Sequence, residues 1–130
     1  VKNPKIYFFD MGFRNYLINN MNRLEQRPDA GAVVENTVFV RLNELFEKPV
    51  DIHFWRTKTG AEVDFVIKNG VELFPIEVKF SAFDMPRVTR GYMSFLEAFK
   101  PKKGLVLTKN YWGRLHKDAS EILCAPVYYL

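Results

Sequence analysis

Apolar and polar residues alternate along two neighbouring stretches of the chain, residues 62–66 and 75–80. Apolar side chains occupy every second position in both stretches. The positions between them carry the charged residues Glu62, Asp64, Glu77 and Lys79. Strict alternation is typical of a β-strand with one buried face. The Asn69-Gly70 pair favours a hairpin turn, because both residue types tolerate positive φ. The pattern therefore predicts a hairpin with apolar side chains on one face and charged side chains on the other.

Two pairing registers of this hairpin keep the apolar side chains together. A tight turn at Asn69-Gly70 sets Glu62 opposite Glu77, and a turn two residues longer sets Asp64 opposite Glu77. A slip by one residue would move every apolar side chain to the wrong face. Either accepted register brings two carboxylates together, which is unfavourable without a nearby cation. The sequence thus predicts a cation at this place, either a metal ion or Lys79.

Hydrophobic periodicity predicts three helices and further strands around the hairpin. We expect helices capped by Asp10 and by Asp29, reaching residues 19 and 47, and a third capped by Ser81 or Asp84. We expect strands at residues 6–9, 51–56, 105–108 and 127–130, with a short helix before the last. Three strands in a meander, followed by a helix that crosses to a parallel strand, make an α/β domain with a mixed central sheet.

Composition limits the class of protein. The 130 residues suffice for one domain, residues 1–130, and contain no apolar run long enough to cross a membrane. A single cysteine, Cys124, excludes an internal disulfide and favours a reducing, cytoplasmic location, and we expect it to be buried. The net charge of +4 suits a polyanionic partner or merely solvated basic faces. The chain begins with Val1, so we expect a fragment of a longer protein.

Glu35 is a further candidate site residue. It lies on the apolar stripe of the second predicted helix, near the N-terminal end. One interpretation is a partly exposed residue that the helix dipole stabilises. The other is a carboxylate directed at the charged face of the sheet, where it would need a cation or hydrogen-bond donors.

Glu35 on a helix, Asp64 on a strand and Glu77-Val78-Lys79 on the next strand resemble the PD-(D/E)xK nuclease superfamily. Residues 54–65 and 75–79, together with 7–14 and 31–45, are similar to one family in particular. That family is the uncharacterised nuclease-like domain at the C-terminus of certain prokaryotic AAA-type ATPases. The resemblance covers nearly the whole chain and implies a restriction-endonuclease-like αβββαβ core. It also implies an N-terminal P-loop ATPase domain outside this sequence, which would be the part that binds ATP.

The resemblance assigns roles to individual residues. Asp64 and Glu77, with the backbone carbonyl of Val78, would hold Mg²⁺ or Mn²⁺. Lys79 would orient or deprotonate the attacking water, and Glu35 would hold a second metal ion or its waters. Glu62 is either a further ligand or a hairpin partner of Lys79. The implied reaction is metal-assisted hydrolysis of DNA phosphodiesters.

Two alternatives to a nuclease remain open. The chain is either a catalytically inactive module that serves the ATPase as a regulatory or interaction domain, or a domain that only binds nucleic acid. In the inactive module, Lys79 would neutralise the acids without a metal. Phosphate contacts in a nucleic-acid complex would come from four basic residues, Arg56, Lys58, Arg87 and Arg90.

Overall fold

The alternating stretches fold as a hairpin. The structure, a computed structural model, describes residues 4–130, so Val1–Asn3 lie outside the description. Strand β2 (Glu62–Asn69) pairs antiparallel with β3 (Glu72–Lys79), from Asn69 opposite Glu72 to Phe65 opposite Ile76. The loop is Gly70–Val71, and Gly70 takes the positive φ of 61° that the turn requires. Of the two predicted registers, this is the one that brings Asp64 level with Glu77.

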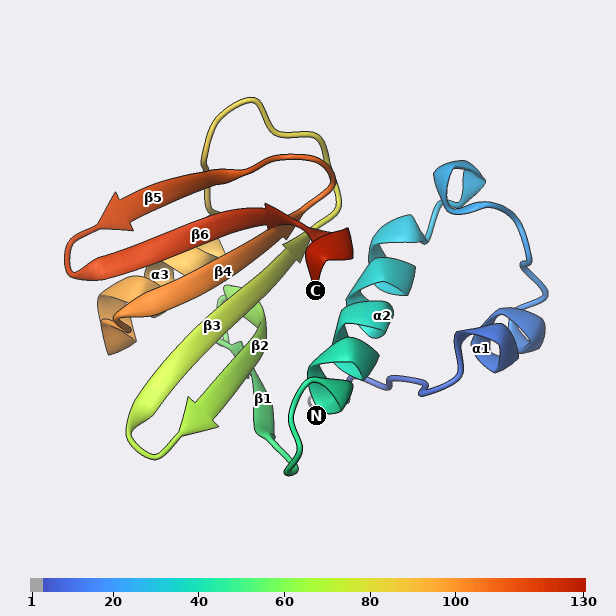
Figure 1. The fold of residues 1–130 in the computed structure, drawn as a ribbon, viewed down its shortest axis with the longest axis horizontal. Helices are drawn as coiled ribbons and strands as arrows, with labels where there is room; N and C mark the ends of the chain where they lie inside the picture. Colours follow the sequence, from blue (N-terminus) through green and yellow to red (C-terminus); the bar gives the residue numbers. More distant parts are fainter. Residues whose placement is uncertain (1–3) are drawn as a thin grey trace.

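Six strands form one mixed sheet in the order β1-β2-β3-β4-β6-β5 (Figure 1). Strand β1 (Asp51–Arg56) pairs antiparallel with β2, and β3 pairs parallel with β4 (Lys103–Thr108). The connection from β3 to β4 passes through helix α3 (Arg90–Phe99). The predicted meander and helical crossover are therefore confirmed, as is the mixed α/β class. The other elements are α1 (Met11–Leu17), η1 (Leu24–Gln26), α2 (Ala30–Glu44), β5 (Gly113–Lys117), β6 (Ser120–Pro126) and η2 (Val127–Tyr129).

Helices cover both faces of the sheet, which corrects the prediction of one buried face. Helix α2 packs on one face and α3 on the other, so neighbouring residues of a central strand enter different cores. In β4, Val106 packs on the α3 side and Leu107 on the α2 side. The α2 core contains Val34, Val38, Leu42, Phe65, Ile76 and Leu107. The α3 core contains Val63, Val66, Phe83, Tyr92, Phe95, Leu96, Val106, Ile122 and Cys124. A charged residue on a central strand therefore faces a packed helix rather than open solvent.

The predicted strand at residues 6–9 is wrong. This segment is extended but joins no sheet. Its backbone pairs with a side chain of α2 instead: Phe8 N–H donates to Asn36 Oδ1 over 2.9 Å, and Asn36 Nδ2 donates to the Phe8 carbonyl over 2.6 Å. The buried Asn36 amide thus does for Phe8 what a neighbouring strand would do.

Three helix boundaries differ from the predictions. Asp29 precedes α2 as expected, but its carboxylate binds Arg27 and Arg14 rather than the helix N-terminus, and α2 ends at Glu44. Helix α3 begins only at Arg90, because Thr89 supplies the cap by accepting a hydrogen bond from Tyr92 N–H over 3.1 Å. The Asp10 cap is confirmed, since its Oδ1 accepts from Phe13 N–H. That helix, α1, ends at Leu17, before the predicted residue 19.

The predicted C-terminal helix and strand are also wrong. Residues 113–126 form the β5–β6 hairpin, and the chain ends in the short η2 turn. Ile122 and Cys124 are buried side chains of β6. Cys124 is fully buried, as predicted. No helix in the described range 4–130 is long and apolar enough to cross a membrane.

Candidate functional site

A β-bulge shapes the beginning of β2. The β1–β2 pairing shifts between His53, which faces Val66, and Trp55, which faces Val63. One β1 residue, Phe54, therefore faces two residues of β2, Asp64 and Phe65. A bulge of this kind re-aims side chains, and here Asp64 contacts the α2 side while Val63 enters the α3 core. A polar side chain thereby reaches α2 at the edge of an apolar core.

The β2–β3 pairing ends next to this bulge. Beyond the pair Phe65 and Ile76, the backbone N–H of Val78 donates to Asp64 Oδ2 over 2.9 Å. A carboxylate thus replaces a main-chain acceptor at the point where the strands separate. Burial raises the pKa of Asp64 and the charge of Glu35 adds to this, while the Val78 N–H and Lys5 act in the opposite direction.

Three carboxylates surround one ammonium group at this place. Lys5 Nζ lies 3.0 Å from Glu35 Oε1, 3.4 Å from Asp64 Oδ1 and 3.5 Å from Glu62 Oε1. Burial alone would lower the pKa of Lys5, but the hydrogen bond and charge of Glu35, with the charges of Asp64 and Glu62, raise it above its ordinary value. We call Lys5, Glu35, Glu62 and Asp64 the acidic cage. Lys5, a residue that the sequence did not suggest, therefore supplies the cation beside Asp64, while the charge of Lys79 acts on Glu77.

Glu35 points at the charged part of the sheet, as the sharper of the two interpretations predicted. In addition to Lys5, its Oε1 accepts a 2.6 Å hydrogen bond from the hydroxyl of Tyr7. Burial raises the pKa of Tyr7, and the negative charge of Glu35 adds to this, so the hydroxyl remains a donor. Tyr7 also stacks on Phe39 of α2, with ring centroids 4.5 Å apart. The N-terminal segment is therefore held against the cage by both polar and aromatic contacts.

Glu77 lies beside the cage on the α3 side. It is buried, with 8% of its surface exposed, and its Oε2 accepts a hydrogen bond of 3.0 Å from Thr89 Oγ1. Burial raises the pKa of Glu77 to about 7. The hydrogen bond from Thr89 and the charge of Lys79 lower it, while the charges of Asp64 and Glu62 raise it further. Glu77 therefore takes part in the same electrostatic cluster, although its hydrogen-bond partner is the cap of α3.

Two hollows flank Glu77. Lys79, Arg87 and Thr89 line the smaller one, of about 80 Å³. Glu62, Arg90 and Gly91 line the larger, which has a volume of about 510 Å³ and reaches the β1–β2 loop. Lys79 is exposed, and Val78 is partly buried and packs against the α2 core.

The four basic residues proposed for phosphate contacts surround this region unevenly. Arg87 and Arg90 border the two hollows. Arg56 Nε is 2.9 Å from Glu62 Oε2, so it is partly neutralised by the cage, and Lys58 is exposed in the turn before β2. Arg87 also lies over the Phe83 ring, 4.5 Å from its centroid. The structure thus brings Arg87 and Arg90 to Glu77 and leaves Lys58 further along the loop.

Chemically, the arrangement is a set of carboxylate oxygens around an ammonium group, next to Glu77, whose pKa is about 7, and the exposed Lys79. The structure brings Glu35, Glu62 and Asp64 together directly, and Glu77 and Lys79 beside them. The site also contains three residues that the sequence did not indicate, Lys5, Tyr7 and Thr89. Of these, only Thr89 carried a signal, because a threonine before an apolar helix is a common N-cap.

Comparisons with known proteins place the chain in a family. Residues 30–127, from the start of α2 to the end of β6, match a family model described as a domain of unknown function, DUF4143. The chain belongs to the DUF4143 family. The matched range contains Glu35, Glu62, Asp64 and Glu77, whereas Lys5 and Tyr7 precede it.

Two curated relatives of this DUF4143 domain come from mycobacteria. Uncharacterized proteins of Mycobacterium bovis and of Mycobacterium tuberculosis are each 31% identical to it over 97 residues. The alignment covers 73% of this chain but 21% of each relative. The chain therefore spans about a fifth of the length of the curated relatives that it matches.

Proposed function

We propose that this DUF4143 chain is a divalent-metal-dependent nuclease domain of the PD-(D/E)xK type that hydrolyses DNA phosphodiesters. The observation that carries the proposal is the meeting of Glu35 and Asp64 at Lys5 Nζ, next to Glu77, whose pKa the charge of Asp64 helps to raise. The element order α2–β1–β2–β3–α3–β4 supports a restriction-endonuclease-like core. The order of the acids and of Lys79 along these elements supports the same assignment.

The donor set suits a magnesium or manganese ion. Carboxylates of Asp64 and Glu77 and the backbone carbonyl of Val78 are hard oxygen ligands, which these ions prefer. The cage already holds an ammonium group within 3.5 Å of three carboxylate oxygens, so its charge favours a cation. Among residues 4–130, no three His, Cys, Asp or Glu side chains stand in a metal-binding arrangement. A metal ion would therefore displace the Lys5 ammonium and draw the carboxylates together.

The protein's own residues would prepare the reaction. A bound divalent ion supplies a water of lowered pKa and neutralises charge on the phosphate. The Val78 N–H fixes one oxygen of Asp64, and Thr89 fixes one oxygen of Glu77, so both carboxylates keep a defined orientation. Lys79, exposed beside Glu77, is free to orient the attacking water or to stabilise negative charge on the phosphate. Glu35 would hold further waters or a second ion.

The partners proposed with this activity are DNA and an ATPase. Arg87 and Arg90 border Glu77 and would contact DNA phosphates, with Arg56 and Lys58 further along the loop. The relatives are about five times as long as the matched part, so they have room for an N-terminal AAA-type ATPase domain. ATP would bind only in that domain, and the whole protein would work in the cytoplasm.

A second candidate function rests on Lys5. Its ammonium neutralises three carboxylates, of which the nuclease proposal gives Glu35 and Asp64 to metal ions. If no divalent ion displaces it, the acidic cage is a structural ion-pair cluster. The domain would then serve the full-length protein as a regulatory, interaction or DNA-binding module without catalysis.

One experiment separates the two functions. The purified chain is titrated with Mn²⁺ by calorimetry, and is then offered branched, single-stranded and duplex DNA with Mg²⁺ or Mn²⁺. The variant Asp64→Asn removes a cage carboxylate, and Asp84→Asn, at an exposed position, serves as the matched control. The nuclease proposal expects Mn²⁺ binding and DNA cleavage that Asp64→Asn abolishes and Asp84→Asn retains. Cleavage that survives Asp64→Asn contradicts the nuclease proposal. The absence of both Mn²⁺ binding and DNA cleavage supports the non-catalytic module.

A further inference from the structure

Residues 9–26 form an arm that turns most of its apolar side chains to solvent, although Leu24 packs on the α2 core and Phe9 lies near the Phe39 ring. The arm contains α1 and η1 and lies on the far side of α2 from the sheet (Figure 1). None of the residues of α1 is buried in the described structure. The exposed large apolar side chains of the arm are Phe9, Phe13, Tyr16, Leu17, Ile18 and Met21. Six large apolar side chains exposed within one short segment indicate a surface that another protein surface covers.

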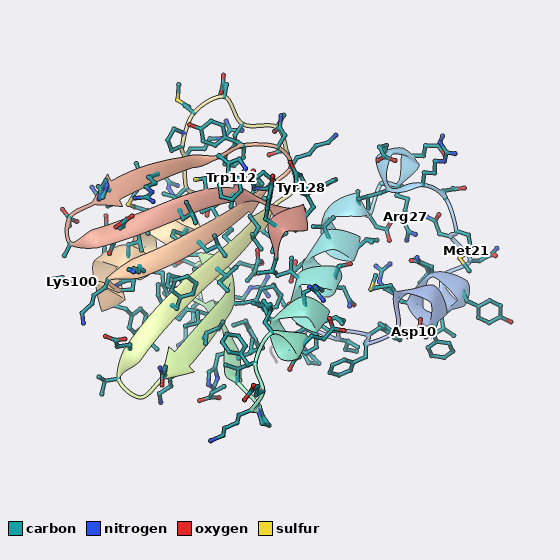
Figure 2. The ribbon with its side chains drawn as sticks, viewed as in Figure 1. Asp10, Met21, Arg27, Lys100, Trp112 and Tyr128 are labelled. Carbon is teal, nitrogen blue, oxygen red and sulfur yellow. The ribbon has the colours of Figure 1, made fainter. Side chains whose placement is uncertain are left out.

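Polar contacts, in contrast, hold the arm from the inside. Arg27, 7% exposed, donates to the Asn20 carbonyl over 2.8 Å and to Asp29 Oδ1 over 2.9 Å. Arg14 of α1 donates to Asp29 Oδ2 over 3.2 Å, which ties α1 to the beginning of α2. Hydrogen bonds from Arg27, followed by those from Arg14, lower the pKa of Asp29 to about 2. Figure 2 shows Arg27 between α2 and the arm, with Asp10 and Met21 on the arm itself.

This arrangement reverses the usual one, in which a surface helix buries its apolar side chains and exposes its polar ones. The most buried positions of α1 are Met11, Arg14 and Asn15, while Phe13, Tyr16 and Leu17 are exposed. A helix as short as α1 gains little stability from its own hydrogen bonds. The arm is therefore built to present apolar side chains outward, and burying them against another surface would add the stability that the helix lacks.

The comparisons indicate what that surface belongs to. The family match begins at residue 30, so the arm lies just before the family domain along the chain. The curated relatives carry about four-fifths of their length outside the matched part. A segment joined to the arm by the same polypeptide reaches it at a high effective concentration, without the cost of bringing two molecules together.

We propose that the arm is the docking surface for an apolar face of the chain that precedes residue 1 in the full-length protein. The contact would fix this domain relative to the rest of the polypeptide. Lys5 lies a few residues before the arm, so the contact would also determine where the chain enters the acidic cage. The proposal stands on the arm alone and does not require nuclease activity.

Hydroxyl-radical footprinting of the full-length protein tests the contact. Tyr16 and Tyr128 form a matched pair, because they are 72% and 71% exposed in this domain (Figure 2 labels Tyr128). The oxidation rate of each is compared with its rate in the urea-unfolded protein. We expect Tyr16 to be protected at least about threefold at every protein concentration, because the centre of an interface excludes water. A Tyr16 rate close to the unfolded rate overturns the proposal, and so does protection that grows with concentration, which indicates a second copy.

Substitution in the full-length protein provides the second test. Tyr16→Arg places a charge in the proposed contact, and Tyr128→Arg places the same charge at a matched exposed site. Neither side chain is buried in the domain, so the circular dichroism spectrum should not change. Met21, 70% exposed on the same arm, should be protected in the unaltered full-length protein. We expect Tyr16→Arg, or the double variant Phe13→Asp/Leu17→Asp, to abolish this protection, and Tyr128→Arg to leave it unchanged. Protection of Met21 that persists in both arm variants overturns the proposal.

Discussion

Lys5 Nζ lies 3.0 Å from Glu35 Oε1, although thirty residues of sequence separate them. The contact joins an extended N-terminal segment to helix α2, and Asp64 and Glu62 of β2 complete the cage. An ammonium group surrounded by three carboxylates is a cation site whose occupant is attached to the chain. A divalent metal ion and Lys5 would therefore compete for the same oxygens.

Replacement of Lys5 should strengthen metal binding, if the cage is a metal site. In Lys5→Met, the three carboxylates lose the ammonium group that neutralises them. Their electrostatic attraction for a metal ion from solution should therefore become stronger. The apparent affinity of a site is its intrinsic affinity multiplied by the fraction of time that the site is free. If Lys5 blocks the cage about 90% of the time, its removal should therefore tighten Mn²⁺ binding about tenfold. Calorimetry with Mn²⁺ measures the change.

Lys68→Met is the control for this substitution, because Lys68 is an exposed residue of β2 outside the cage. It should leave the Mn²⁺ affinity unchanged. An equal affinity of Lys5→Met and the unaltered chain would show that Lys5 does not compete with the ion, whatever the DNA cleavage assay gives.

The Glu77 carboxyl should make stability depend on pH. Its pKa is 4.5 in the ordinary state and about 7 in the fold, chiefly through burial. Because this pKa is raised, the folded protein binds the Glu77 proton more tightly than the unfolded chain does. The resulting contribution to the free energy of unfolding is complete below pH 4.5 and is lost as the pH rises through 7. The shift corresponds to about 3 kcal/mol. Urea unfolding in EDTA should therefore show that Glu77→Gln gains stability relative to the unaltered chain between pH 5 and pH 8.

Glu47→Gln, at an exposed position, is the reference for that measurement. Its stability difference from the unaltered chain should be the same at pH 5 and pH 8. If Glu77→Gln behaves in the same way as Glu47→Gln, the Glu77 carboxyl is not protonated in the fold near neutral pH, and the burial argument fails.

The sequence predicted the strands of the site better than its cation. Alternation along residues 62–66 and 75–80 is a local signal, so the hairpin could be read directly and its register narrowed to two, of which the structure has one. The apolar stripe of α2 likewise indicated the direction of Glu35. The bulge at Asp64 and Phe65 could not be predicted, because it depends on how β1 pairs with β2 across the sheet.

Lys5 escaped prediction for a related reason. The apolar run at residues 6–9 has the composition of a strand, but its backbone partner is a side chain, Asn36, rather than another strand. Such side-chain to backbone bonds between distant segments leave no periodic pattern. The late start of α3 is similar, because residues 81–89 contain acceptable caps and the structure uses Thr89.

Asn36 should be critical for the N-terminal segment. Its amide satisfies both the N–H and the carbonyl of Phe8, and it is buried. Asn36→Ala would leave both groups without their partner, so it should lower the free energy of unfolding by about 2–3 kcal/mol. Asn43→Ala is the control, because Asn43 bonds only the Phe39 carbonyl within its own helix. Equal losses in urea unfolding would contradict the role given to Asn36.

Two glycines at equivalent helix positions should respond oppositely to alanine. Gly31 and Gly91 are each the second residue of a helix, α2 and α3. A Cβ at Gly31 meets nothing within 4 Å, whereas one at Gly91 would lie 2.5 Å from the Glu62 carbonyl oxygen and 2.7 Å from its nitrogen. Alanine is the better helix former, so Gly31→Ala should stabilise the chain by up to about 1 kcal/mol. Gly91→Ala should destabilise it by about 1–3 kcal/mol, because backbone has to move.

The Gly91 substitution also bears on the site. Gly91 lies between Thr89, which bonds Glu77, and the rest of α3, and the Cβ would press on the backbone of Glu62 in the cage. The hydrogen bond from Thr89 lowers the pKa of Glu77. Moving α3 away from β2 should lengthen this hydrogen bond, so the pKa of Glu77 should rise further. NMR titration of Glu77 in Gly91→Ala, with Gly31→Ala alongside, measures this. An unchanged Glu77 pKa together with lost stability would show that the close packing of α3 on β2 serves the fold without positioning Glu77.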